Sequence, residues 1–97
     1  MAQEAEDILR LIQGSKGVLG SLIVNNEGIP IKTNLNNALS VQYAGLMQNL
    51  VEKTRLIVKE LDPSNELSSF RIRTAKHEII VTPDRDYIFI TIQESTD

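Results

Sequence analysis

The sequence predicts an α/β layered domain of the α+β class, with a five-stranded, mostly antiparallel sheet between a short helix and a long helix. Three observations predict it: apolar residues at helical spacing near the amino terminus, a proline-free amphipathic stretch over residues 38–61, and alternating apolar and polar residues in the last third. The 97 residues allow one hydrophobic core. We therefore expect the element order αββαβββ in a single domain spanning residues 1–97.

The first third of the chain predicts one short helix and one hairpin. The helix should end at Gly14, and its apolar residues have the i, i+3, i+4, i+7 spacing of one helix face: Ala5, Ile8, Leu9 and Ile12. A strand over residues 18–24 is followed by Asn and Gly residues at 25–28, which favour a tight turn. The returning strand, residues 29–33, contains Pro30, which implies a place near a sheet edge.

The rest of the chain predicts the long helix and three strands. Asparagines before residue 38 suit a helix N-cap, and Asp62-Pro63 ends the helix because the residue before a proline avoids helical angles. Alternation predicts strands at residues 70–73 and 78–82. Residues 87–92 are apolar on both faces, which is typical of a strand covered on both sides, so this strand should be central.

The long helix has two apolar stripes. We assign the first to the sheet: Leu39, Tyr43, Leu46, Leu50, Ile57 and Leu61. The second consists of Ala44, Met47, Val51 and Val58. Together they span roughly 160°, wider than the ~100° that packing on one sheet needs. We expect the second stripe to be covered by a partner subunit or, alternatively, by the first helix or a loop.

Composition excludes several classes of function. A net charge of −3 argues against nucleic acid as a partner, and the absence of cysteine excludes disulfides and thiolate metal sites. The acidic amino terminus is unlike a secretory signal, and no apolar run approaches the ~18 residues of a membrane span. We expect a cytoplasmic protein without membrane insertion.

Candidate catalytic residues are few. His77 has no second histidine or cysteine beside it, and Asp84 and Asp86 flank Arg85 in a turn headed by Pro83, where acidic residues favour the bend. No phosphate-binding glycine motif is present. We expect neither enzymatic activity nor a metal, a cofactor or a small-molecule substrate.

The sequence resembles the roadblock family of dynein light chains. Residues 22–32 are similar to the family's hairpin, Gln42-Tyr43-Ala44 to the start of its long helix, and residues 70–93 to its carboxyl-terminal strands. The resemblance implies a roadblock/profilin-like fold and a non-catalytic adaptor associated with the cytoskeleton. It also implies a homodimer, in which the long helices meet and the third strands pair edge to edge. The implied partner is a helical segment of a dynein intermediate chain, in microtubule-based transport; the alternative is a scaffold or regulator of a small GTPase in a trafficking complex.

We expect two sets of residues to contact other proteins. The expected dimer interface contains the surplus helix stripe and the strand beside it: Met47, Val51, Val58, Phe70 and Ile72. The expected partner site is a groove on the side of the short helix: Leu11, Arg71, Arg73 and Ile80. An amphipathic helix with acidic flanks would fit such a groove. For the two arginines, protection of a sheet edge by charge is the alternative, and Ile80 alone could be an ordinary exposed apolar residue.

Overall fold

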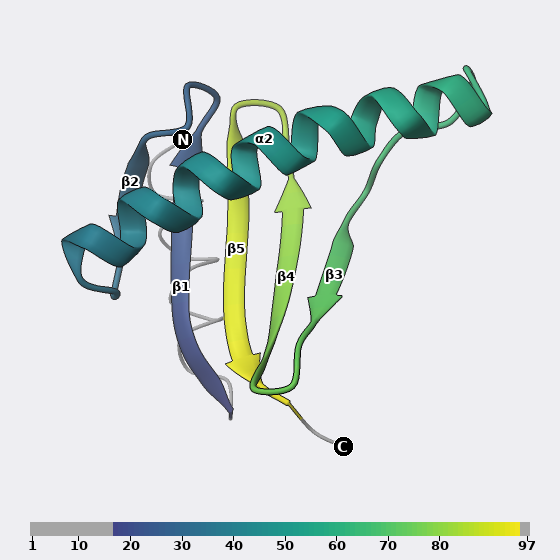
Figure 1. Ribbon diagram of the computed structural model, residues 1–97. Helices are drawn as coiled ribbons and strands as arrows, with labels where there is room; N and C mark the ends of the chain where they lie inside the picture. Colours follow the sequence, from purple (N-terminus) through teal and green to yellow (C-terminus); the bar gives the residue numbers. More distant parts are fainter. Residues whose placement is uncertain (1–16, 96–97) are drawn as a thin grey trace.

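The computed structural model describes residues 17–95, where one helix crosses one face of a five-stranded antiparallel sheet (Figure 1). The elements are β1 (Val18–Asn25), β2 (Pro30–Thr33), α2 (Asn37–Leu61), β3 (Phe70–Arg73), β4 (His77–Pro83) and β5 (Tyr87–Glu94). Their order confirms the predicted sequence of strands and long helix. The predicted short helix, and Leu11 with it, lies outside the described residues.

The sheet has the order β2-β1-β5-β4-β3, so β5 is the middle strand, as its apolar composition predicts. Ile88, Phe89 and Ile90 are successive buried residues of β5, and they point to alternate faces of the sheet. β2 and β3 are the two edge strands, and Pro30 in β2 therefore lies at an edge as expected.

Local polar chemistry sets the hairpin and the start of the helix. The Asn25 Oδ1 accepts hydrogen bonds from the backbone N–H groups of Glu27 and Ile29. Gly28 has a φ of 82°, at which a residue with a side chain would be strained. Asn36 is the N-cap of α2, and its Oδ1 accepts from the N–H of Leu39 at 2.8 Å. These contacts place the turn and the helix where the sequence predicts them.

The assignment of the two helix stripes was wrong. The stripe that α2 buries against the sheet contains Ser40, Ala44, Met47 and Val51, packed with residues such as Leu22, Val81 and Ile90. Its first members are small, so the helix can approach the sheet closely, and the Ser40 hydroxyl donates to Thr33 Oγ1 at 3.0 Å. Of the stripe of larger side chains that we assigned to the sheet, Tyr43 and Leu50 are half-buried and pack against this core. The other four members, Leu39, Leu46, Ile57 and Leu61, are exposed on the flank of α2.

Candidate interaction surfaces

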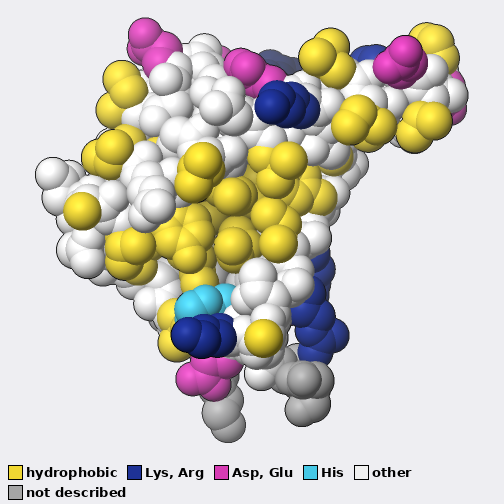
Figure 2. Space-filling model, in the orientation of Figure 1, with side chains coloured by type: hydrophobic (Ala, Val, Ile, Leu, Met, Phe, Trp, Pro, Cys, Tyr) yellow, Lys and Arg dark blue, Asp and Glu magenta, His cyan; other side chains and the backbone are white. Residues whose placement is uncertain are grey.

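The first candidate surface is the apolar flank of α2, which we define as Leu39, Tyr43, Leu46, Leu50, Ile57 and Leu61. Leu46 and Ile57 are 57% and 56% exposed, and Leu61 is 82% exposed. Beside the helix, a cavity of about 290 Å³ is lined by Leu39, Gln42, Tyr43, Leu46, Met47 and Ile79. Figure 2 shows hydrophobic side chains gathered over a broad area below α2, on the face of the sheet that the helix crosses. Such a contiguous apolar area is typical of a protein interface.

An open sheet edge continues this surface. β3 pairs with β4 alone among the described strands, so its outer edge is available to a further strand. The carboxyl-terminal part of α2 extends past β3 beyond the sheet (Figure 1). Phe70 and Ile72 are half-buried at this edge, packed against the core under α2.

The expected dimer interface is therefore corrected in part. Met47 and Val51 are buried within the single chain, with 9% and 1% of their surface exposed, and cannot be the surplus stripe. Val58 is half-buried. The exposed residues that sequence analysis missed are Leu46, Ile57 and Leu61 of the apolar flank; the width of the apolar arc indicated that such a surplus exists, but not which half of the arc it occupies.

The second candidate surface is the opposite face of the sheet at β3 and β4. Arg71 lies directly across from Ile80 in the antiparallel register, and Arg73 across from Glu78. All four side chains project to the face away from α2, because the alternating residues Phe70 and Ile72 pack toward the helix. The structure thus brings Arg71, Arg73 and Ile80 together as the sequence predicted. Their use as a partner site stays a prediction.

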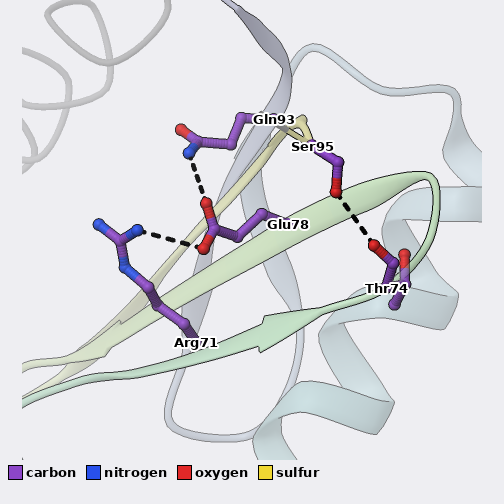
Figure 3. A network of polar contacts seen from close by, with 5 residues as sticks. All are labelled: Arg71, Thr74, Glu78, Gln93 and Ser95. Carbon is purple, nitrogen blue, oxygen red and sulfur yellow. Dashed lines mark hydrogen bonds and ion pairs between the residues drawn. The ribbon is translucent and has the colours of Figure 1, made fainter. Parts of the chain in front are cut away.

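A polar network holds Arg71 in place on this face (Figure 3). The Arg71 Nη1 is 3.2 Å from Glu78 Oε2, and the Gln93 Nε2 donates to Glu78 Oε1 at 2.8 Å. The hydrogen bond from Gln93, together with Arg71 and the charge of Arg73, holds the pKa of Glu78 below its ordinary value, although burial acts in the opposite direction. Sequence analysis missed Glu78 and Gln93, because only the register of β4 and β5 brings them together.

Of the remaining candidates, Asp84 and Asp86 line one cavity beside α2 together with Arg55, and His77 is not among the residues that line it. His77 begins β4, and its backbone N–H donates to Thr74 Oγ1 in the β3–β4 turn. Within residues 17–95, no group of three or more His, Cys, Asp or Glu residues could hold a metal ion. No helix in that part of the chain is long and apolar enough to cross a membrane.

The described residues form a small α+β domain with two candidate interaction surfaces, the apolar flank of α2 and the charged face of β3 and β4. The Roadblock/LC7 domain family model matches residues 4–94, and the chain belongs to this family. The resemblance read from the sequence is thereby confirmed at the level of the family.

Solved structures share the fold at low sequence identity. A Roadblock/LC7 domain from Streptomyces avermitilis matches with a TM-score of 0.81 and 12% identity, covering 91% of this chain and 77% of that chain. The gliding protein MglB from Thermus thermophilus matches with a TM-score of 0.79 and 11% identity, covering 95% of this chain and 72% of that chain. A structure described as MglB with a tetrameric arrangement matches with a TM-score of 0.79 and 11% identity, covering 95% of this chain and 71% of that chain. At these identities the likeness is one of fold.

Proposed function

We propose that the chain is a non-catalytic scaffold that forms a homodimer and serves a small GTPase in a trafficking or motility complex. The observation that carries this proposal is the apolar flank of α2 beside the open edge of β3. A second copy is the occupant that fits both features, since its flank and its edge strand would meet their own counterparts across a twofold axis. The tetrameric arrangement of a protein with this fold supports self-association.

The apolar flank alone is too small to hold a micromolar dimer. Full burial of a Leu or Ile side chain contributes roughly 1.5–3 kcal/mol, so four side chains at about half exposure contribute ~4 kcal/mol per subunit and ~8 kcal/mol per dimer. Loss of translational and rotational freedom opposes association by about 4–15 kcal/mol, whereas micromolar affinity needs a net ~8 kcal/mol. Backbone pairing of two β3 strands and filling of the cavity beside Tyr43 are therefore also required in the proposed dimer.

A small GTPase is the partner we favour over a dynein intermediate chain. This fold resembles that of small-GTPase partners, and the similar structures include a gliding protein, whereas none of those named above is described as a dynein subunit. The dynein intermediate chain remains the competing candidate, and the two interpretations predict different partners in one experiment.

The homodimer is tested with two α2 variants of equal exposure. Leu46 and Val41 are both 57% exposed, but only Leu46 belongs to the apolar flank. Leu46→Asp should give a particle of the chain mass, 10.9 kDa, where the parent gives twice that mass in light scattering after gel filtration. Val41→Asp, the matched control, should remain dimeric. A parent protein of 10.9 kDa at concentrations well above micromolar would disprove the homodimer.

The partner is tested by affinity purification from an extract of the source cells, with the parent chain and Leu46→Asp as baits. The extract is divided and supplied with GDP or with a non-hydrolysable GTP analogue. A small GTPase retained by the parent in one nucleotide state supports the proposal. Retention of an intermediate chain and other motor subunits, independent of nucleotide, would favour the dynein adaptor instead. Stimulated GTP hydrolysis by the pure GTPase with added chain would add a regulatory role.

The sheet face around Ile80 is our proposed contact for that partner. Ile80 is half-buried beside Arg71, whose guanidinium Glu78 already holds in position. Arg71→Gln should weaken partner binding by at least about tenfold, since a charge-assisted hydrogen bond contributes roughly 1.5–3 kcal/mol. Ile80→Asp should also weaken it, because a carboxylate would replace an apolar contact. Both variants should leave the dimer mass unchanged. Calorimetry with the purified partner measures the loss. Normal binding by both variants would move the contact to another face.

A further inference from the structure

The open edge of β3 presents the backbone groups of its two arginines. The Thr74 N–H donates to the His77 carbonyl at 2.8 Å, so the pair that closes the β3–β4 hairpin is hydrogen-bonded. Bonded and non-bonded pairs alternate along an antiparallel ladder. Arg73 and Arg71 lie one and three positions from the closing pair, so they occupy non-bonded positions opposite β4. Their N–H and C=O groups therefore point away from β4, toward the open edge.

The inference rests on the proposed homodimer, in which two β3 edges pair about a twofold axis. Both copies then keep α2 on the same face of the joined sheet, because their apolar flanks meet there. The paired residues must be those whose backbone groups point outward, so Arg71 of one copy lies opposite Arg73 of the second copy. A shift by two residues would place Arg71 opposite Arg71, or Arg73 opposite Arg73. Each of these registers sets an arginine against an arginine.

The arginine side chains of both copies would gather on one face of the joined sheet. Arg71 and Arg73 project away from α2, because they alternate with Phe70 and Ile72, which pack under the helix. Directly opposed side chains have Cβ atoms about 4.5–5.5 Å apart, and diagonal neighbours at about 7–8 Å are within reach of long side chains. Like charges in these positions oppose pairing. Dimerisation thus creates a cluster of guanidinium groups that one chain alone does not have.

The charge of this face is positive. The charged residues of β3, β4 and β5 that project to it are Arg71, Arg73 and Glu78, two positive minus one negative. Glu78 binds Arg71, whereas within residues 17–95 the Arg73 guanidinium forms no hydrogen bond and acts on Glu78 through its charge alone. Glu66 and Lys76, in the loops on either side of β3, carry opposite charges. Two copies therefore bring two excess positive charges to the line where their β3 strands pair, which we call the seam.

We propose that the seam binds an inorganic phosphate dianion between the Arg73 guanidinium groups of the two copies. The planar fork of an arginine matches a phosphate bidentately. The two negative charges of the ion match the two excess positive charges. A tetrahedral ion can also lie on the twofold axis and accept the same hydrogen bonds from both copies. A peptide segment has no such symmetry, which favours the ion as the occupant.

Phosphate would strengthen the dimer as well as bind to it. The site is complete only when two copies pair, so the ion binds the dimer in preference to the single chain and shifts the equilibrium by mass action. It also offsets the repulsion between arginines across the seam. Without the ion, the guanidinium groups that form the site weaken the dimer. Removal of Arg73 should therefore have opposite effects on dimerisation and on phosphate binding.

The test is sedimentation equilibrium of the full chain, which measures the dissociation constant of the dimer. The two media are ~10 mM phosphate at about pH 8 and sodium chloride of the same ionic strength, so that screening is equal. Phosphate should lower the dissociation constant of the parent by about tenfold. In chloride, Arg73→Gln should lower it by about fivefold, because the repulsion is removed, and phosphate should then change it by less than about twofold.

Arg85→Gln is the matched control, since it removes the same charge from an exposed arginine of the β4–β5 turn. It should respond to phosphate as the parent does. Circular dichroism checks that each variant is folded. A third medium, an acetylated, amidated Glu-Glu peptide at the same ionic strength, presents carboxylates in place of the ion.

The outcomes separate this site from the dimer on which it depends. A parent chain that stays monomeric would refute the homodimer and the site together, whereas a dimer that is equally strong in phosphate and chloride would refute the site alone. An equal phosphate effect on the parent and on Arg73→Gln would place the ion elsewhere. A weaker Arg73→Gln dimer in chloride would show that the guanidinium groups do not face one another. A dimer strengthened by the peptide and not by phosphate would assign the seam to an acidic partner segment.

Discussion

Val51→Ala tests the corrected packing of α2 most directly. Val51 is 1% exposed and belongs to the core cluster under the helix. Two carbon groups are lost, at about 0.8 kcal/mol each, and the cavity left behind adds a fraction of a kcal/mol. We expect the free energy of unfolding to fall by about 2 kcal/mol. For a domain of this size that corresponds to a decrease in Tm of roughly 10 °C.

Ile57→Ala is the matched change on the apolar flank. Ile57 is 56% exposed in the single chain, so its truncation should lower the free energy of unfolding of a monomer by well under ~1 kcal/mol. In a dimer the same side chain would be covered, and its loss should then weaken association. The two variants separate burial within one chain from burial between two chains.

Urea unfolding at two protein concentrations, below and above the dissociation constant, is the assay. Val51→Ala should show the same loss at both concentrations, because its contacts lie within the subunit. In dilute protein, Ile57→Ala should have nearly the same free energy of unfolding as the parent. In concentrated protein its free energy of unfolding should be lower than that of the parent, because dimerisation stabilises the parent by mass action. Equal losses for both variants in dilute protein would refute the packing described for α2, since Ile57 would then be as deeply buried as Val51.

Three further changes probe the network and the glycines. The hydrogen bond from Gln93, and after it Arg71, lowers the pKa of Glu78 from its ordinary value of 4.5. Glu78 therefore stabilises the folded state fully above pH 4.5, and this stabilisation is lost as the pH falls through the lowered pKa. Urea unfolding against pH should show this loss, and Glu78→Gln should remove it. Gly45→Ala should raise Tm, since a Cβ there meets no atom within 4 Å and alanine favours a helix by ~1 kcal/mol. Gly28→Ala should lower Tm, since φ is +82° at this residue; an unchanged Tm would contradict the turn geometry.

The strands were predictable because their signals are local. β3 has the predicted bounds, while β4 and β5 extend one or two residues beyond theirs. Alternation has a period of two and needs no knowledge of the partner strand. The end of α2 follows from the backbone of the residue before Pro63, which is again local. Apolar residues on both faces of β5 predicted its central place for the same reason.

The polar parts of the candidate surfaces were not predictable in this way. Glu78 reads as a solvent-facing residue of a strand, yet it is 9% exposed, because Gln93 from β5 and Arg71 from β3 supply its hydrogen bonds. Only the pairing of three strands reveals this arrangement.

The reversed stripes of α2 change which experiment tests dimerisation, although the inference of a surplus surface survives. That inference depended on the width of the apolar arc, and a helix of any orientation leaves part of a ~160° arc uncovered by one sheet. The identity of the uncovered part depends on how closely the helix approaches the sheet, which Ser40 and Ala44 determine here. An aspartate at Val51 would place a charge in the core and unfold the chain, so loss of the dimer would prove nothing about the interface. The same substitution at Leu46 leaves the core intact, so loss of the dimer there identifies the interface.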